Sequence, residues 1–236
     1  MERLQKVIAD SGYTSRRKAE QLITEGKVSV NGQIVTLLGT KVSPSDSIEI
    51  EGKSITKNDN KVYFLLNKPR GTITSTSDEK GRKTVIDIID TTERIYPVGR
   101  LDYDTTGLLI LTNDGTLANK LMHPSNKVIK TYLAKINGIL DKEAINKLKN
   151  GVIVDDQKIN IVDFKVQKKN LAKNVSYISI SIIEGKNHIV KKIFQSLGYL
   201  VDKLTRTNYA FLDLGNLKSG EYRSLTIKEV KKLYNI

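Results

Sequence analysis

Two aspartates and an arginine lie close together between glycines in the stretch Gly99-Arg100-Leu101-Asp102-Tyr103-Asp104-Thr105-Thr106-Gly107. Val98 precedes this stretch and the apolar run 108–111 follows it, so we expect the polar cluster at a junction between two buried strands. A carboxylate held there on a rigid scaffold can act as a nucleophile or as a general base. The same spacing also fits a turn whose aspartates accept hydrogen bonds from neighbouring backbone N–H groups. The local pattern leaves both interpretations open.

Composition limits which cofactors and compartments the chain can use. Its 236 residues contain no cysteine and two histidines, His123 and His188. Disulfides, thiol catalysis and thiolate metal sites are therefore excluded, and two distant histidines do not indicate a zinc site. We expect neither a metal nor another cofactor. The mean hydropathy of −0.32 is ordinary for a soluble protein, and no apolar run approaches the roughly 20 residues that span a bilayer. We expect a cytoplasmic protein.

The charge points to a polyanionic partner. The net charge is +13 and the isoelectric point is near 9.6, values typical of proteins that bind nucleic acid. Residues 1–60 hold nine basic and eight acidic side chains. The main polyanion-binding surface is therefore expected beyond residue 60. Lysines far outnumber arginines, a bias that genome composition also produces, so the charge carries less weight than its size suggests.

The first 58 residues predict a compact module. We expect a helix over 3–9, a second helix from Arg16 to Gly26 capped by Thr14-Ser15, a hairpin over 27–35 with Asn31-Gly32 at its turn, and a further β segment over 42–51. Arg16, Arg17 and Lys18 crowd the start of the second helix, where the helix dipole favours an anion. The alternative is a packing subdomain with a solvated run of charge.

The motif S-R-R-K-A-E-Q-L-I-x-x-G-x-V-x-V-N-G within residues 14–32 resembles the S4-type RNA-binding domain of a ribosomal protein and many RNA-modifying enzymes. The resemblance implies that the second helix and the adjoining hairpin contact RNA phosphates. The residues we expect to do so are Arg16, Arg17, Lys18, Lys27 and Asn31. The polar segment 57–60 reads as a linker, so a second domain is expected over residues 61–236.

The second domain is predicted to be mixed α+β with a large, mostly antiparallel sheet. We expect strands at 62–66, 95–98, 108–112, 131–136, 159–166, 176–182, 203–207 and 211–214, and helices at 116–122, 142–150 and 188–196. The turn Asn67-Lys68-Pro69-Arg70-Gly71 is basic. We expect Lys68 and Arg70 to contact phosphates, with a solvated surface pair as the alternative. His123 and Tyr209 are interpreted as packing residues.

Four motifs carry a second resemblance: N-K-P-R-G at 67–71, G-R-L-D-Y-D-T-T-G-L-L-I-L-T-N-D-G at 99–115, K-T-Y at 130–132 and E-G-K-N-H-I-V-K-K-I-F at 184–194. They resemble the pseudouridine synthase family of the RsuA/RluB type, and the likeness covers essentially residues 1–236. It implies that Asp102 is the catalytic aspartate, Tyr132 the residue stacked on the target base and Lys191 the basic partner of Asp102. Asp104 is expected to be structural. Ile189 and Ile193 replace the family's usual glutamine and methionine.

Pseudouridine formation suits these residue types. The reaction breaks the N1–C1′ bond of uridine, rotates the uracil, joins C5 to C1′ and removes the C5 proton. Asp102 would attack C1′, or take a proton from C2′ to form a glycal, and the sequence leaves both routes open. Either route needs an ionised carboxylate, which a neighbouring lysine favours. Tyr132 would stack on the uracil, and its hydroxyl would serve removal of the C5 proton.

The target base must leave a stacked RNA helix, so further RNA contacts are needed. Arg100 is a candidate to fill the vacated space by stacking. A salt bridge to Asp104 or to a phosphate is an equal alternative for Arg100. We also expect RNA contacts from Lys130, Lys186 and Lys192, which lie in the motifs around Tyr132 and Lys191.

Three functions remain open at this stage. The favoured one is modification of one uridine in large-subunit 23S rRNA, because the opening residues 1–9 and the stretch 80–87 look like the large-subunit branch of the family. The alternatives are a 16S rRNA synthase and a non-catalytic RNA-binding assembly protein. The joint presence of Asp102, Tyr132 and Lys191 argues against the last. The expected partner is free 23S rRNA or a large-subunit assembly intermediate. We expect the protein to be a monomer and not to bind a membrane.

Overall fold

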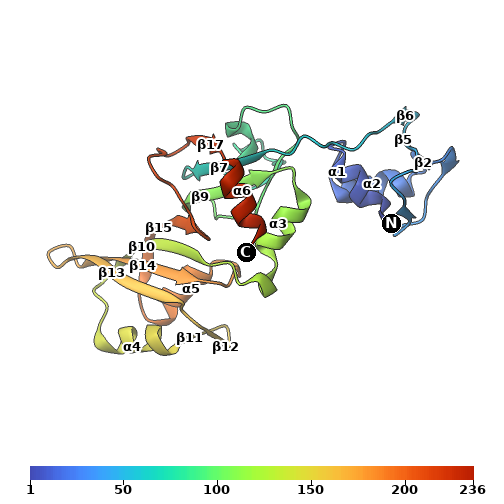
Figure 1. Cartoon of the computed structure of the whole chain (residues 1–236). Coiled ribbons are helices and arrows are strands. Elements are labelled where there is room, and N and C mark those ends of the chain that lie inside the picture. The colour runs from blue at the N-terminus through green and yellow to red at the C-terminus, as the bar shows by residue number, and fades with distance from the viewer. The chain divides into compact units, whose positions relative to one another are not determined.

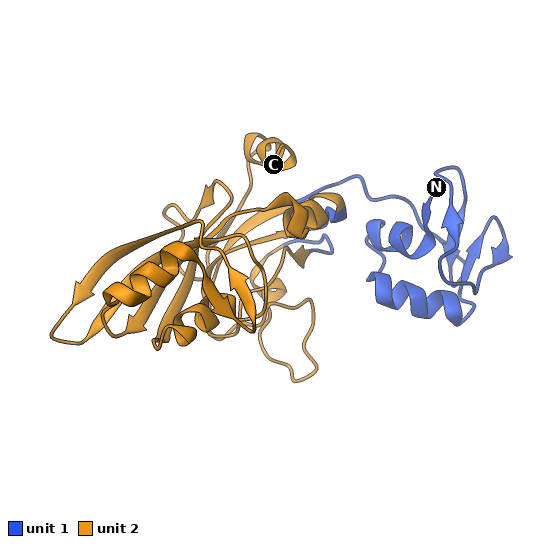
Figure 2. Cartoon of the chain, turned by 90° about the horizontal axis from the view of Figure 1, so that it is seen from below, with its two compact units in different colours: residues 1–62, 91–95, 113–115 blue, residues 63–90, 96–112, 116–236 orange.

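A computed structural model describes all 236 residues, which form two compact units (Figure 2). Unit 1 holds residues 1–62, 91–95 and 113–115, and unit 2 holds 63–90, 96–112 and 116–236. No helix in the chain has both the length and the apolar character needed to cross a membrane.

Unit 1 is built from two short helices and two small sheets (Figure 1). One sheet pairs β1 with β4, and the other has the strand order β3-β2-β5-β6. The elements are β1 (Glu2–Arg3), α1 (Leu4–Asp10), α2 (Arg16–Thr24), β2 (Val28–Val30), β3 (Gln33–Ile34), β4 (Lys41–Val42), β5 (Ile48–Ile50) and β6 (Lys53–Ser54). Both predicted helices and the predicted hairpin are confirmed.

Local sequence explains why these elements begin and end where they do. The Ser15 side chain accepts a hydrogen bond from the Lys18 backbone N–H at 3.2 Å, which caps α2. Asn31 and Gly32 adopt φ angles of 51° and 78°, as a two-residue turn between twisted strands requires. Buried side chains from both helices and from β2, β4 and β5 form one cluster that lies wholly within the first 50 residues. This part of the chain therefore has a core of its own.

The predicted linker is hydrogen-bonded in its second half. The side-chain amides of Asn58 and Asn60 each donate to the Glu93 carboxylate at 2.6 Å. Asn113 donates to the Asn60 carbonyl at 2.8 Å. The pKa of Glu93 lies below its usual range, mainly because of the hydrogen bond from Asn58. Residues 58–60 are thus held by two later segments of the chain.

Unit 2 is dominated by a nine-stranded sheet with the order β13-β14-β10-β15-β9-β7-β17, with β16 added to β15 and β8 to β9. Only β15 and β9 run parallel, so the predicted mostly antiparallel sheet is confirmed. The strands of unit 2 are β7 (Tyr63–Lys68), β8 (Tyr96–Pro97), β9 (Thr106–Thr112), β10 (Lys130–Asn137), β11 (Val152–Val154), β12 (Gln157–Ile159), β13 (Asp163–Asn170), β14 (Val175–Ile182), β15 (Leu200–Tyr209), β16 (Leu212–Asp213) and β17 (Tyr222–Ser224).

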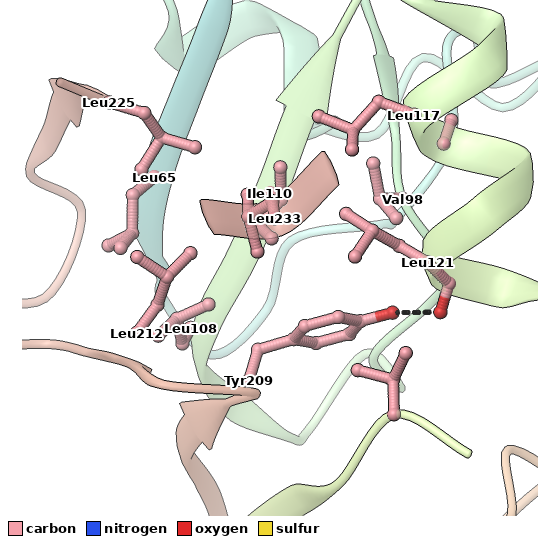
Figure 3. Close-up of a cluster of buried hydrophobic side chains, with 12 residues drawn as sticks. Leu65, Val98, Leu108, Ile110, Leu117, Leu121, Tyr209, Leu212, Leu225 and Leu233 are labelled. Atoms are coloured by element: carbon pink, nitrogen blue, oxygen red, sulfur yellow. Dashed lines mark hydrogen bonds between the residues drawn. The ribbon is translucent and has the colours of Figure 1, made fainter. Parts of the chain in front are cut away.

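Helices pack on this sheet at both ends. They are η1 (Ile86–Ile88), α3 (Gly115–Met122), η2 (Pro124–Asn126), α4 (Lys142–Asn150), α5 (Ile189–Ser196) and α6 (Ile227–Tyr234). Side chains of α3 and α6 meet those of β7 and β9 in one buried cluster (Figure 3). The Tyr209 hydroxyl donates to the Leu121 carbonyl at 2.8 Å within it. Tyr209 is therefore a packing residue as predicted, whereas the same prediction for His123 was wrong, because that side chain is exposed.

Two parts of unit 2 differ from the sequence prediction. The single strand expected over 159–166 is divided into β12, which pairs with β11, and β13, which pairs with β14. The C-terminal β17 and α6 were not predicted, although α6 begins with a capping box between Thr226 and Glu229. Leu225 and Leu233 from this region complete the buried cluster.

Deleting residues 1–57 should leave a folded fragment. The deletion removes the whole apolar cluster of unit 1 but keeps Asn58 and Asn60, which bond Glu93 and Asn113. We expect a cooperative thermal transition by circular dichroism, and a higher RNA concentration for half-saturation. A fragment starting at Lys61 is the control for the asparagine contacts. Aggregation of the 58–236 fragment would contradict the prediction.

Candidate active site

A pocket of about 380 Å³ opens where five segments of unit 2 meet, one of which is α3 with Met122. Residues 99–105 form one wall, and the segment 185–190 leading into α5 forms another. Tyr132 of β10 and Arg206 of β15 supply the sheet side of the pocket. The pocket thus contains Asp102, the residue that the sequence singled out.

Lys68 holds the Asp102 loop from beneath. The strand β7 continues through Lys68, which pairs with Gly107 of β9 and has no exposed surface. Its ammonium donates to the backbone carbonyls of Asp102 at 3.0 Å, Thr105 at 2.9 Å and Pro69 at 3.2 Å. Burial lowers the pKa of Lys68 to about 8, and the negative charges of Asp102 and Asp104 oppose that shift. A phosphate contact by Lys68 is ruled out in this position, so that expectation is corrected.

The loop is also held from its sides. Gly71 donates its backbone N–H to the Tyr103 carbonyl at 2.8 Å, and the Thr74 hydroxyl donates to the Leu101 carbonyl at 2.7 Å. Gly107 ends the loop with a φ of 105°, and a Cβ there would lie 2.2 Å from the Arg206 carbonyl oxygen. Only glycine permits this approach of β9 to β15. The loop is therefore held on both sides of Asp102, by Gly71 and Thr74 at its neighbours and by β15 at Gly107.

The Asp102 carboxylate faces two basic side chains. His188 Nε2 lies 3.2 Å from Asp102 Oδ1, and Lys191 Nζ lies 3.5 Å from Asp102 Oδ2. The Asp102 side chain keeps 23% of its surface exposed. It is thus surrounded by positive or proton-donating groups yet reachable from the pocket, as a nucleophile or a base must be.

Lys191 contacts both aspartates, and it is closer to the second one. Its ammonium lies 2.7 Å and 2.9 Å from the two carboxylate oxygens of Asp104. The hydrogen bond from Lys191 is the main reason that the pKa of Asp104 lies below its usual value. Asp104 thus orients Lys191 beside Asp102. Arg100 does not pair with Asp104, because its exposed side chain makes no ion pair.

His188 is the site residue that sequence reasoning missed. It adopts a left-handed backbone conformation, φ 55°, at the residue before α5. Its side chain is about half exposed at the mouth of the pocket. The sequence feature that could have identified His188 is its position three residues before Lys191, since residues spaced by three lie on one face of a helix. Ile189 and Ile193 are buried instead, so these departures from the usual motif serve the core.

Tyr132 lies in β10, the strand between β14 and β15 in the sheet. It pairs with Ile180 of β14 on one side and with Arg206 of β15 on the other. Only 9% of the Tyr132 surface is exposed, and Tyr132 is one of the residues that line the pocket. Lys130, two residues earlier on the same face, donates to the carbonyls of Val128 at 3.0 Å and Ile183 at 2.9 Å. Burial lowers the pKa of Lys130.

Apart from Lys68 and Lys130, the residues expected to contact RNA fall into two groups. Four arginines are exposed and have no ion pair or hydrogen bond from their side chains, namely Arg16, Arg17, Arg70 and Arg100. The other exposed or half-exposed candidates already have protein partners: Lys18 with Gln21, Lys27 with Glu25 and Glu51, Asn31 with Asp46, Lys186 with Gln157 and Lys192 with Asp155. Exposed pairs of this kind are weak because water screens their charges, so a phosphate can replace the partner.

Comparison with known proteins decides the family. The family model described as RNA pseudouridylate synthase matches residues 62–196, a region that contains most of the residues lining the pocket, including Asp102, Tyr132 and His188. The chain belongs to this family. The S4 domain model matches residues 2–48. As a member of the family, the protein is a pseudouridine-forming isomerase with an RNA-binding S4 domain.

The relatives cover nearly the full chain. "Ribosomal large subunit pseudouridine synthase B" of Bacillus subtilis is 52% identical over 234 residues, which is 99% of this chain and 96% of the relative. An uncharacterized RNA pseudouridine synthase of Aquifex aeolicus is 41% identical and covers 98% of this chain and 93% of its own length. A crystal structure of a pseudouridylate synthase has a TM-score of 0.69 and 30% identity, covering 99% of this chain and 100% of that one.

Replacing Lys68 with methionine should slow catalysis without unfolding the protein. Methionine fills a similar buried volume, but the carbonyls of Asp102 and Thr105 lose their shared donor. Misplacing a catalytic group by about 1 Å can cost about 100-fold in rate. We expect a loss of that order in single-turnover pseudouridine formation, with a cooperative thermal transition retained. Lys80→Met, at an exposed position, is the matched control; a Lys68→Met rate equal to wild type would refute the role.

Proposed function

We propose that this protein converts one uridine of large-subunit 23S rRNA to pseudouridine, with Asp102 as its catalytic carboxylate. The observation that carries the proposal is the Asp102 carboxylate, partly exposed in the pocket and flanked by His188 and Lys191 at 3.2 Å and 3.5 Å. The large-subunit assignment rests on the Bacillus subtilis relative, whose name states that substrate and whose sequence is 52% identical over nearly the whole chain.

Asp102 acts on the sugar of the target nucleotide in this proposal. Its carboxylate either attacks C1′ or takes the C2′ proton, and in both cases the N1–C1′ bond breaks. Lys191 and His188 place positive charge or proton donors beside the carboxylate. Lys68 fixes the backbone of the loop, so little reorganisation is needed when substrate binds. Asp104 serves by orienting Lys191.

Tyr132 provides the surface on which the uracil stacks. Its ring lines the pocket at the strand next to Arg206, and a mostly buried tyrosine loses little rotational freedom when a base stacks on it. The hydroxyl serves removal of the C5 proton, directly or through water. The base reaches this position after it is flipped out of its helix, at a cost of a few kcal/mol.

RNA binding is divided between the two parts of the chain. Residues 1–58 form the S4-type domain, in which Arg16 and Arg17 present free guanidinium groups at the start of α2. Residues 61–236 form the catalytic domain, in which the exposed Arg70 contacts phosphate and the exposed Arg100 fills the space of the flipped base. The paired residues exchange their partners for phosphates, and Lys130 contacts RNA from inside the pocket.

The form of the substrate follows from this mechanism. The target uridine must be free to flip, so we propose that the enzyme acts on free rRNA or on an assembly intermediate. We propose a monomer, because Asp102, Tyr132 and His188 in the pocket all come from one chain, and we propose that it acts in the cytoplasm.

Replacing Asp102 with asparagine should abolish pseudouridine formation. An amide of the same shape keeps the fold and RNA binding, but it can neither attack C1′ nor accept the C2′ proton. The assay is carbodiimide labelling and primer-extension mapping of rRNA from a strain that lacks the gene, treated with purified enzyme. Asp104→Asn is the matched control and should lose less, since it acts through Lys191.

Two results of that assay would count against the proposal. Appreciable turnover by Asp102→Asn would remove Asp102 from its role. Modification by the wild-type enzyme that is confined to 16S rRNA would overturn the large-subunit assignment while leaving the enzyme class in place.

Replacing Tyr132 with phenylalanine should preserve base stacking and slow the reaction. The variant keeps the aromatic ring but lacks the hydroxyl that serves removal of the C5 proton. We expect unchanged RNA affinity and a single-turnover rate lower by about 100-fold or more, the usual contribution of a proton-transfer group. An unchanged single-turnover rate would reduce Tyr132 to a stacking surface.

A further inference from the structure

Arg206 is a buried cation without an anionic partner. Its side chain is 2% exposed, and its Nε donates to the Leu108 carbonyl at 2.7 Å. Its Nη2 is fully buried and has no hydrogen-bond partner, and no carboxylate lies within ion-pair distance of the guanidinium. A buried charge without a partner costs several kcal/mol. Such a group calls for a functional explanation.

The guanidinium is fixed in place and borders the pocket. The parallel pairing of β15 with β9 sets Arg206 beside Gly107, and the antiparallel pairing with β10 sets it beside Tyr132. Its Cζ lies 5.1 Å from the centroid of the Tyr209 ring. Burial raises the pKa of Tyr209 to about 12, so that hydroxyl stays neutral and supplies no counter-charge. Arg206 therefore lines the pocket beside Tyr132 with its guanidinium fixed in place.

The proposed reaction produces a negative charge at this place. When the N1–C1′ bond breaks, its electron pair stays on the uracil, which becomes an anion with charge shared among N1, O2 and O4. C1′ is then bonded to the Asp102 carboxylate, or the C2′ proton is on Asp102 and a C1′=C2′ double bond has formed. The uracil rotates and C5 attacks C1′. In the first route the C1′–O bond to Asp102 breaks, and in the second Asp102 returns its proton to C2′, so Asp102 regains its original state in both. The C5 proton is finally lost and N1 gains a proton.

We propose that Arg206 stabilises the uracil anion and holds it during its rotation. This inference rests on the proposed function, in particular on uracil stacking at Tyr132. The Arg206 guanidinium, which lines the pocket, donates to a uracil carbonyl oxygen, and the uracil anion supplies the negative charge that no carboxylate provides within ion-pair distance. A donor placed in advance at a site of developing charge favours the transition state over the ground state. Lys130 is less suited to this role, because two of its three ammonium donors are bonded to backbone carbonyls and one is left for RNA.

Arg206→Gln is the informative variant. The glutamine amide can still donate to the Leu108 carbonyl, so the fold keeps that bond, but the positive charge is lost. Arg206→Lys restores the charge without the fixed planar geometry. Arg70→Gln is the matched control, because that arginine is exposed and is proposed to contact phosphate only.

The test measures how strongly the reaction rate depends on the stability of the uracil anion, which is the leaving group. Prefolded RNA carries either uridine or 5-fluorouridine at the target position, because fluorine at C5 makes the uracil anion more stable. Single-turnover loss of the N1-linked nucleoside is followed by nuclease digestion, chromatography and mass spectrometry at saturating enzyme, so C5 deprotonation is not part of the readout. RNA affinity and thermal unfolding are measured for each variant.

We expect Arg206→Gln to react with uridine about 100-fold to 1000-fold more slowly than wild type, as when one oxyanion-stabilising donor is removed. Its rate ratio of 5-fluorouridine to uridine should exceed the wild-type ratio by about tenfold. Arg206→Lys should lie between the two. Arg70→Gln should weaken binding and leave the ratio unchanged.

Three outcomes would overturn the inference. Weaker binding by Arg206→Gln with a wild-type rate at saturation would make Arg206 a phosphate contact. A slower rate with an unchanged fluorouridine ratio would make its role structural. An unchanged rate would give it no role. A wild-type enzyme that forms no pseudouridine would instead refute the proposed function, so the two failures are distinguishable.

Discussion

The site depends on one buried ammonium. Lys68 extends from the last position of β7 into the underside of the Asp102 loop, where it donates to the backbone carbonyls of Asp102 and Thr105, and it also donates to the carbonyl of Pro69. A lysine is seldom buried completely, because desolvation of its charge is costly, and the depressed pKa of Lys68 records that cost. Three carbonyl acceptors match the three donors of an ammonium group. The loop can therefore present a carboxylate outward while its own polar backbone is satisfied from inside the protein.

A second constraint is the sharing of one lysine between two carboxylates. Lys191 is bonded to Asp104 and lies 3.5 Å from Asp102, whose other oxygen faces His188. If Asp102 alone held Lys191, a tight ion pair would occupy both oxygens and hinder their approach to the sugar. Sharing keeps the positive charge near Asp102 without closing off its carboxylate. The two aspartates of the motif thus have different tasks, which their spacing of two residues makes compatible.

Much of this arrangement could be predicted from sequence, and the rest had specific physical obstacles. The amphipathic α2, the Asn31-Gly32 turn and the apolar β9 carry strong local signals, and the motifs located Asp102, Tyr132 and Lys191. The position of Lys68 was predicted wrongly because a lysine before proline looks like a surface turn, whereas its burial depends on the carbonyls of Asp102 and Thr105, which lie more than 30 residues away in the chain. Arg206 lies in an alternating strand where nothing local marks an unpaired cation. His188 was missed because its role depends on a left-handed backbone angle and on Asp102 across the pocket.

The parallel contact between β9 and β15 has a consequence for how the enzyme becomes competent. It joins two halves of the sheet through two registered residue pairs, Thr106 with Thr205 and Gly107 with Arg206. These partners are about a hundred residues apart in the chain, and contacts at such separation form late because closing a long loop is entropically expensive. Asp102 lies next to the half of the sheet that contains β9, whereas Tyr132 and Arg206 lie in the half that contains β10 and β15. A chain in which only one half of this sheet has folded has no assembled active site. The protein can therefore catalyse its reaction on RNA only after this whole domain has folded.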